Sequence, residues 1–170
     1  MAKQDTANNG SDDIKKIGEL IKDIDFTMMT TIDENGELHS RPMSTQKTEF
    51  DGDVYFFAFD NTEKAEHISL NPNVNLAYSA PDLQTYVSLK GEAEILNDRQ
   101  KMEELWNPGL LLWFPQALET PHITLIKVKV KSAEYWESSG AIAYVIALVK
   151  AAATGKSQDM GENKTVSLAN

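Results

Sequence analysis

The chain has 170 residues, enough for one domain with a full hydrophobic core and too few for two of ordinary size. Its 26 acidic and 16 basic side chains give a net charge of −10, which argues against a protein that grips nucleic acid or an anionic membrane through broad basic patches. The absence of cysteine excludes disulfides, thiolate metal sites and cysteine nucleophiles.

The sequence predicts one domain over residues 11–156, between a flexible N-terminal tail at 1–10 and a polar C-terminal tail at 157–170. The first ten residues lack an apolar signal core, and the longest apolar tract, 141–149, is shorter than the about 20 residues of a membrane span. We therefore expect a cytoplasmic protein without a membrane partner.

The first element expected in chain order is a helix, because isoleucines recur at helical spacing at Ile14, Ile17, Ile21 and Ile24. From residue 26 onward the pattern changes to short strands. Asn35-Gly36 predicts a hairpin between strands 26–32 and 38–46, and Asp51-Gly52 predicts a second hairpin between 37–50 and 53–59.

Alternating apolar residues predict the remaining strands, and Gly91 is expected to mark a bulge in one of them. These strands cover residues 74–78, 86–96, 123–131 and 133–137. Three further helices are expected: residues 63–70 after Thr62, a short helix after Asn97 or Asp98, and an alanine-rich helix at 141–153.

The predicted fold class is mainly β: about seven antiparallel strands with three or four helices. Successive hairpins without the spacing of βαβ units favour a small barrel or sandwich over a doubly wound sheet.

Several common sites are missing from the sequence. It contains neither a glycine-rich nucleotide loop nor a Gly-x-Ser-x-Gly nucleophile motif. The histidines His39, His67 and His122 form no i, i+4 pair and have no acidic cluster near them in the sequence, so we expect no metal site. His67 is interpreted as a surface or boundary side chain.

One constellation suggests an anion site. In a two-residue turn at Asp51-Gly52, Arg41 would lie opposite Thr62, roughly 5 Å away across the ladder, with Lys64 just beyond the strand end. The N-terminus of the helix 63–70 would add unpaired N–H groups, which makes a phosphate pocket. The alternative is that Arg41 pairs with Asp60 or Glu63 and Lys64 is solvated.

The three tryptophans form a second group. Trp106, Trp113 and Trp136 precede loops or strand ends, where flat rings could border a planar ligand; the alternative is core or interface packing. Trp136 is the most open of the three, because the polar segment 137–140 follows it at once.

The chain resembles the pyridoxamine-phosphate-oxidase-like flavoproteins, specifically their general-stress-protein branch. The matching stretches lie in the family's order at residues 39–44, 54–79, 86–108, 113–115 and 133–145, which read HSRPMS, VYFFAFDNTEKAEHISLNPNVNLAYS, YVSLKGEAEILNDRQKMEELWNP, WFP and AEYWESSGAIAYV.

The resemblance implies an FMN-binding split β-barrel with the flavin at a homodimer interface. The family's phosphate-binding Arg-x-x and Ser/Thr-x-Lys correspond here to Arg41, Pro42 and Met43 and to Thr62, Glu63 and Lys64. Phe57 and Ala58 occupy strand positions whose backbone lies beside the flavin, and Tyr86 stands where relatives often carry a cofactor-contacting glutamine. Trp136 matches the late tryptophan that borders the flavin from the partner subunit.

Three departures from the family pattern bear on function. Position 46 is glutamine where relatives often carry lysine, and residues 138–143 lack the basic residues that follow the late tryptophan in the oxidases. The loop 116–121 lacks the glycine and paired aspartates of stress-protein relatives. The missing basic residues at 138–143 argue against pyridoxamine phosphate oxidation, and the altered loop at 116–121 either shapes a different pocket or shapes none.

The resulting hypothesis is an FMN-binding general-stress-type flavoprotein acting as a flavin-dependent oxidoreductase of unknown substrate, with no side chain identified as catalytic. The alternative from another class is a non-catalytic flavin carrier or sensor in the stress response. A third reading keeps the barrel and gives it a deazaflavin or haem ligand.

Overall fold

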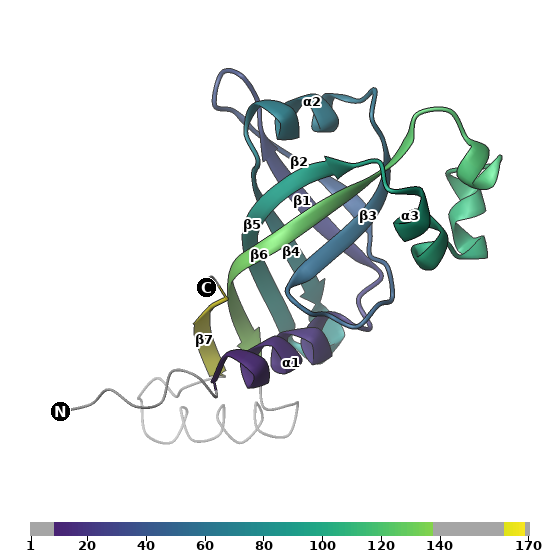
Figure 1. Ribbon diagram of the computed structural model, residues 1–170. Helices are drawn as coiled ribbons and strands as arrows, with labels where there is room; N and C mark the ends of the chain where they lie inside the picture. Colours follow the sequence, from purple (N-terminus) through teal and green to yellow (C-terminus); the bar gives the residue numbers. More distant parts are fainter. Residues whose placement is uncertain (1–8, 138–161, 169–170) are drawn as a thin grey trace, which may run out of the picture.

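One antiparallel sheet, curled into a half-barrel, forms the body of the computed structural model, which describes residues 9–137 and 162–168 (Figure 1). The strands follow the order β2-β1-β4-β5-β6-β3, and β7 pairs with β6 beside this path. The prediction of a mainly β, antiparallel split barrel is therefore confirmed. The strands are β1 (Phe26–Ile32), β2 (Leu38–Ser44), β3 (Asp53–Phe59), β4 (Asn73–Ala80), β5 (Thr85–Leu96), β6 (Ile123–Glu137) and β7 (Glu162–Ser167).

Helices close the two ends and one side of this sheet (Figure 1). In the view of Figure 1, α1 lies at the lower end of the sheet, α2 at the upper end, and α3 to one side with the green 3-10 turns that follow it in the chain. Their bounds are α1 (Asn9–Ile21), α2 (Glu63–Leu70), α3 (Arg99–Leu105), η1 (Pro81–Leu83), η2 (Pro108–Leu112) and η3 (Ala117–Glu119). None of the helices among the described residues is long and apolar enough to cross a membrane.

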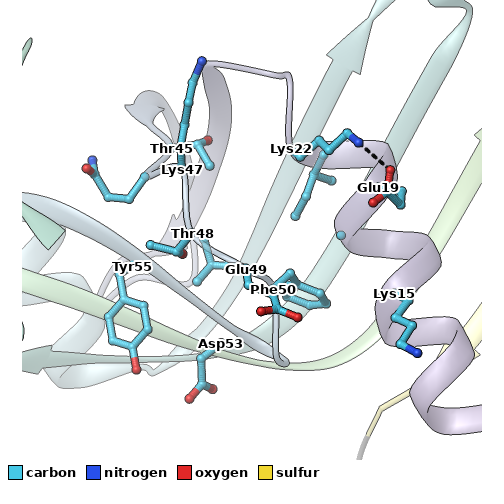
Figure 2. Close-up of a pocket in the computed structure, with 14 residues that line it drawn as sticks. Lys15, Glu19, Lys22, Thr45, Lys47, Thr48, Glu49, Phe50, Asp53 and Tyr55 are labelled. Atoms are coloured by element: carbon cyan, nitrogen blue, oxygen red, sulfur yellow. Dashed lines mark hydrogen bonds and ion pairs between the residues drawn. The ribbon is translucent and has the colours of Figure 1, made fainter. Parts of the chain in front are cut away.

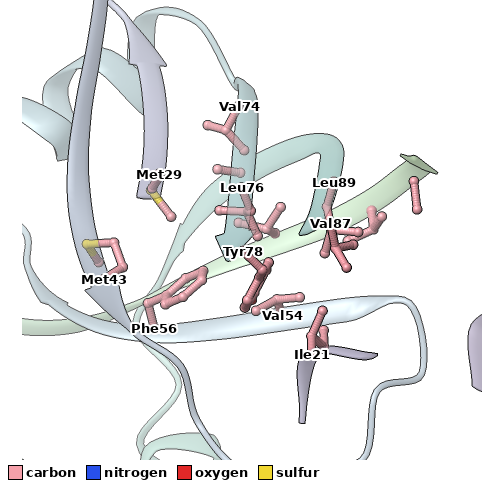
Figure 3. Close-up of a cluster of buried hydrophobic side chains, with 14 of the residues drawn as sticks. Ile21, Met29, Met43, Val54, Phe56, Val74, Leu76, Tyr78, Val87 and Leu89 are labelled. Carbon is pink, nitrogen blue, oxygen red and sulfur yellow. The ribbon is translucent and has the colours of Figure 1, made fainter. Parts of the chain in front are cut away.

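The core fills the concave face of the sheet (Figure 3). Alternate residues of each strand point inward, as the period of two requires, so that Met29, Phe56, Leu76 and Leu89 have essentially no exposed surface. Ile17 and Ile21 of α1 complete this core from one end. A second cluster gathers under α3 and η2; it consists of Phe57, Met102, Leu105, Leu110, Phe114 and Leu125.

The first predicted hairpin is confirmed. Strands β1 and β2 pair from Phe26↔Ser44 to Ile32↔Leu38, and Gly36 in the connecting turn has a φ of 81°, which glycine adopts without strain. Asp33 fixes this turn because its Oδ1 accepts hydrogen bonds from the N–H groups of Asn35 and Glu37.

The second predicted hairpin is wrong. Strand β2 ends at Ser44, and β3 pairs along its whole length with β6, from Asp53↔Lys129 to Phe59↔Ile123. The turn at Asp51-Gly52 is present, with Gly52 at a φ of 108°, but it is not followed by a β2–β3 ladder. Turn chemistry is local, whereas the apolar β3 finds two-sided burial between the core and the cluster under α3 by pairing with β6.

The glycine predicted to mark a bulge does so. The register between β5 and β6 shifts between Lys90 and Gly91, and a Cβ on Gly91 would lie 2.4 Å from the carbonyl oxygen of Lys129. Only glycine permits this approach of the two backbones.

Two predictions about the C-terminal part are revised. Residues 123–137, expected as two strands, form the single strand β6, because Ser132 continues the ladder with Lys90. The polar tail expected at 157–170 contains β7, which pairs with β6 from Ser132↔Ser167 to Glu137↔Glu162 and buries Val166. The helix expected at 141–153 lies outside the described residues.

Candidate functional site

The half-barrel has an open side between β2 and β3. These two strands are the ends of the sheet path, and each has a single neighbour within the described sheet. Edge strands present a row of backbone N–H and C=O groups that can bind a ligand or another chain. The candidate site lies along this open side.

Arg41 lies on β2, next to this opening. Its Cα partner is the fully buried Met29, so its side chain starts on the concave face of the sheet. Nη1 of Arg41 donates a hydrogen bond of 2.8 Å to Oγ1 of Thr31. Burial lowers the pKa of Arg41, and the nearby carboxylate of Glu63 partly offsets this effect.

Helix α2 brings the second cation to the same place. Lys64 is half-buried, and its pKa is lowered first by burial and then by the positive charge of Arg41. Two like charges are thus held near each other, and neither of them forms an ion pair with a carboxylate among the described residues. Such a pair favours an anion.

The N-terminus of α2 adds backbone donors. Thr62 is the N-cap residue, and its carbonyl oxygen accepts hydrogen bonds from the N–H groups of Ala65 and Glu66. The N–H groups of Glu63 and Lys64 precede these bonds and have no intrahelical partner. The Thr62 hydroxyl does not cap the helix; it donates to the carbonyl oxygen of Phe59, 2.9 Å away.

The alternative prediction for the two cations finds limited support. Asp60 does not meet Arg41, because its carboxylate lies 2.9 Å from Nδ1 of His122. Glu63 is near enough to influence the pKa of Arg41, yet no ion pair between them occurs in the described part of the chain. Arg41, Glu63 and Lys64 do come together, although the hairpin register that predicted it is wrong.

The other predicted site residues on β2 and β3 are either buried or exposed, depending on the face of the strand they occupy. Ala58 and Met43 are buried in the main core, Phe57 is buried in the cluster under α3, and Pro42 is exposed on the outer face of β2. These four residues can therefore contribute to the open side through their backbone groups.

Tyr86 and Trp136 lie elsewhere in the chain. They are direct Cα partners in the β5–β6 ladder, and 43% of Tyr86 and 40% of Trp136 is exposed. Both project from the outer face, since the neighbouring Val87 and Tyr135 point inward. Strand β5 is three strands from β2, or about 14 Å across the sheet. These two rings do not reach the Arg41 and Lys64 of their own chain.

The histidine prediction is wrong in part. His67 is buried, with 8% exposed, and its Nδ1 lies 3.0 Å from Oγ1 of Thr31. His39 has an acidic neighbour after all: its Nε2 lies 3.2 Å from Oδ2 of Asp33, and its ring centroid lies 4.9 Å from that of His67. Glu37 joins them, and the three ligand atoms of Asp33, Glu37 and His39 lie within 4.8 Å of one another.

Sequence reasoning also missed Thr31 and His67 as neighbours of Arg41. A detectable signal existed for Thr31, because it faces the same side of β1 as Met29 and stands next to the turn that sets the β1–β2 register. For His67 the sequence offers only its position one turn after Glu63 on α2, a spacing that does not indicate burial.

Two cavities flank the segment 45–48, which leads away from β2. The first, of about 350 Å³, lies between α1 and residues 45–50, with Lys15, Glu19 and Lys22 on the helix side and Phe50 at its floor (Figure 2). It contains none of the predicted site residues.

The second cavity, of about 610 Å³, lies between the end of β2 and η2. Its lining includes the aromatic side chains of Phe26, Trp106 and Trp113. Its polar lining includes a neutral pair, in which Nδ2 of Asn107 donates a hydrogen bond of 3.1 Å to Oε1 of the buried Gln46. The prediction that tryptophans border a ligand site is consistent with this cavity for Trp106 and Trp113.

An antiparallel sheet curled into a half-barrel, with Arg41 and Lys64 near each other beside the N-terminus of α2, defines a protein of the split-barrel class. A family model described as "Pyridoxamine 5'-phosphate oxidase like" matches residues 12–159, and the chain belongs to this family. The resemblance deduced from the sequence is thereby confirmed.

Named relatives point to the general-stress branch. General stress protein 26 of Bacillus subtilis is 30% identical over 100 residues, covering 56% of this chain and 69% of that protein. A structure described as a general stress protein 26 from Jannaschia sp. CCS1 matches with a TM-score of 0.75 and 25% identity, over 92% of this chain and 99% of the other. The fold is also shared with the general stress FMN/FAD binding protein of Xanthomonas citri, at a TM-score of 0.65, 22% identity and coverages of 77% and 92%.

Proposed function

We propose that this protein binds FMN along its open side and uses it as a flavin-dependent oxidoreductase in the cytoplasm. The observation that carries the proposal is the approach of Arg41 and Lys64 to each other beside the N-terminus of α2. A phosphate monoester supplies the negative charge that this arrangement lacks. The printed description of the Xanthomonas citri neighbour as FMN/FAD binding supports a flavin as the molecule that carries the phosphate.

In this proposal the phosphate accepts hydrogen bonds from Arg41, Lys64 and the first N–H groups of α2. The flavin then lies along the unpaired edges of β2 and β3, beside Pro42, Met43, Phe57 and Ala58, where backbone groups can bind its polar atoms. Bound flavin supplies the redox chemistry, and the protein supplies binding and orientation.

We also propose that the protein is a homodimer. Four large apolar side chains stand exposed on the outer face of the sheet, with exposed fractions between 40% and 52%: Phe26, Met28, Tyr86 and Trp136. A second copy packed on this face would remove them from water. It would also let Tyr86 and Trp136 approach the flavin of the other subunit, which they cannot do within one chain.

An oxidoreductase needs room for a substrate, and the cavity of about 610 Å³ beside the end of β2 supports this role over that of a carrier. Lys47 in its lining is 3.2 Å from Asp25, and the pair Gln46–Asn107 is neutral. An uncharged aromatic substrate fits this lining better than a phosphate ester does.

The central test is flavin binding by the purified protein. Wild-type protein should show the visible absorption spectrum of a flavin, or bind added FMN with quenched fluorescence. Arg41→Ala and Lys64→Ala should each weaken FMN binding by roughly ten- to a hundredfold, because a charge-assisted hydrogen bond in a partly shielded site contributes about 1.5–3 kcal/mol.

The matched control is Lys22→Ala, which removes an exposed lysine paired with Glu19 on α1. Unchanged FMN affinity in both site variants would disprove the pocket.

To separate enzyme from carrier, reduced nicotinamide cofactors are added to the FMN-loaded protein without oxygen. Repeated bleaching and recovery of the flavin absorption on readmitting an electron acceptor supports the oxidoreductase, whereas absorption that never changes supports the carrier.

A further inference from the structure

Arg41 belongs to a buried hydrogen-bond network of three side chains. Nη1 of Arg41 donates to Oγ1 of Thr31 at 2.8 Å, and the same oxygen lies 3.0 Å from Nδ1 of His67. Thr31 has no exposed surface and His67 has 8%, so both partners are shielded from water. Hydrogen bonds in such surroundings are stronger than at the surface.

The hydrogen bond from Arg41 to Thr31 has one possible direction, and the direction of the bond between Thr31 and His67 is set by the tautomer of His67. A guanidinium can only donate, so the oxygen of Thr31 must be the acceptor for Arg41. The single hydroxyl proton of Thr31 is then available to Nδ1 of His67, which accepts it when the ring proton is on Nε2. In this arrangement the Thr31 hydroxyl accepts one hydrogen bond and donates another.

This hydrogen-bond network connects three elements of the fold. Arg41 is on β2, Thr31 on β1 and His67 on α2, the helix that also carries Lys64. One hydroxyl therefore ties the position of the Arg41 guanidinium to the helix whose N-terminus faces the proposed phosphate.

Arg41 needs a fixed hydrogen-bond partner, here called the tether, because two neighbouring charges act on its guanidinium in opposite directions. The positive charge of Lys64 repels its guanidinium, and the carboxylate of Glu63 attracts it. Without a fixed partner, a long and flexible side chain would move away from Lys64 in the absence of an anion. Holding it in place before binding avoids the loss of side-chain entropy on binding.

We propose that Thr31 and His67 are positioning residues that hold Arg41 ready for a phosphate monoester and so make the site prefer FMN over riboflavin. The proposal rests on the proposed function, since it concerns the same pocket. It assigns the preference for the phosphate to two residues that touch neither the phosphate nor the flavin ring.

The test compares FMN with riboflavin, which has the same ring and no phosphate. Both flavins are titrated into flavin-free protein, and affinities are measured by fluorescence quenching. Thr31→Val removes the hydroxyl and keeps the shape. We expect FMN binding to weaken about tenfold while riboflavin binding stays unchanged, so that the preference for FMN falls by the same factor.

A closely matched control lies on the same strand. Thr27 is as buried as Thr31 and faces the same side of β1, but its hydroxyl has no hydrogen-bond partner among the described residues. Thr27→Val should leave both affinities unchanged. Thr31→Ser, which restores a hydroxyl, should recover most of the FMN affinity lost in Thr31→Val.

His67 provides a second, independent arm. His67→Leu should reduce the preference for FMN, and His67→Asn, which keeps a polar atom near the place of Nδ1, should restore part of it. This arm stays informative if Thr31→Val does not fold, which the thermal midpoint of each variant reports.

The outcomes separate the two proposals. If Thr31→Val and His67→Leu weaken the binding of FMN and of riboflavin equally, the positioning role of Thr31 and His67 is refuted while FMN binding stands. The same conclusion follows if these variants change the affinity for neither flavin. If wild-type protein binds FMN no more tightly than riboflavin, the phosphate pocket itself is wrong, and the tether falls with it.

Discussion

Glu63 is the residue whose charge acts against the proposed ligand. It lies in the first turn of α2, close enough to Arg41 that its charge offsets part of the lowering of the Arg41 pKa caused by burial. A carboxylate there stabilises the helix N-terminus and repels a phosphate at the same place.

Glu63→Gln should therefore bind FMN about two- to threefold more tightly than wild type, a small effect because Glu63 is exposed to solvent. Titration at low and high salt checks the cause, since the gain should shrink as salt screens the charge. A gain that is independent of salt, or a loss of affinity, would contradict this role. Glu66→Gln, on the exposed side of the same helix, is the control.

Tyr78 makes stability depend on alkaline pH. It is a core residue of β4 with 2% exposed, and burial raises its pKa to about 12 from the ordinary value of 10.0. Between these two values the unfolded chain loses the proton while the folded chain keeps it. The stability contributed by the neutral form is thus complete below pH 10 and is lost as pH rises toward 12.

The shift of about two units corresponds to about 3 kcal/mol in the free energy of unfolding. Tyr78→Phe cannot ionise, so its stability should fall less steeply than that of wild type over this range. Urea unfolding at pH 8 and at successive values above pH 10 measures the difference. Parallel curves for the two proteins would refute the assignment.

At the scale of elements, local patterns predicted the bounds of α2 and the β1–β2 hairpin well, because the residues that start and stop a helix and those that form a turn act within a few positions. Helix α2 begins at Glu63 after Thr62, as the sequence indicates, and β1 meets β2 across Asn35-Gly36. Pairing between distant strands was not predictable in this way. The partner of β3 depends on burial against two clusters, and that of β7 on a ladder reaching back to β6.

This difference also explains why the site residues were found for a partly wrong reason. Arg41 and Lys64 meet because β1 and α2 contact each other, not because β2 pairs with β3. The side chains that connect them, Thr31 and His67, carry no motif, since a buried threonine in a strand and a histidine in a short helix are common in cores. Family resemblance supplied the positions, and only the three-dimensional arrangement supplied the contacts.

Gly91 is the element-scale feature most sensitive to substitution. A Cβ at this bulge would meet the Lys129 carbonyl oxygen at 2.4 Å, and that oxygen belongs to the backbone of the neighbouring strand. Gly91→Ala should lower the free energy of unfolding by about 2–3 kcal/mol, since either strand must shift. Gly10→Ala is the control, because a Cβ there meets nothing within 4 Å. Equal thermal midpoints for both variants would show that the bulge tolerates a side chain.

At the scale of the whole molecule, the proposed dimer decides the role of Trp136. Its ring is exposed in one chain and stands beside Tyr86 on the outer face. In a dimer that brings this face to the partner's flavin, the indole would quench flavin fluorescence and add stacking area.

Trp136→Leu should brighten bound FMN and weaken its binding by about 1 kcal/mol, roughly fivefold. Fluorescence yield and affinity are measured together with the thermal midpoint. If only the midpoint changes, Trp136 is a packing residue. Sedimentation of the FMN-loaded protein at micromolar concentration tests the dimer itself, and a compact monomer would refute it.

Within the described sheet, the unpaired edges of β2 and β3 have a consequence for how the protein behaves in the cell. Exposed strand edges are templates for the growth of intermolecular sheets, and natural proteins usually cover or charge them. Here β2 and β3 both end the sheet path, so a molecule that lies between them also acts as a cap against self-association.

We therefore expect the flavin-free protein to aggregate more readily than the protein saturated with FMN. Flavin-free protein held at moderate temperature should develop light scattering and thioflavin fluorescence, while an equal sample saturated with FMN stays clear. Should both samples stay clear, the edges need no cover. Should FMN protect, a shortage of flavin is expected to lower the amount of this protein that stays free of aggregates.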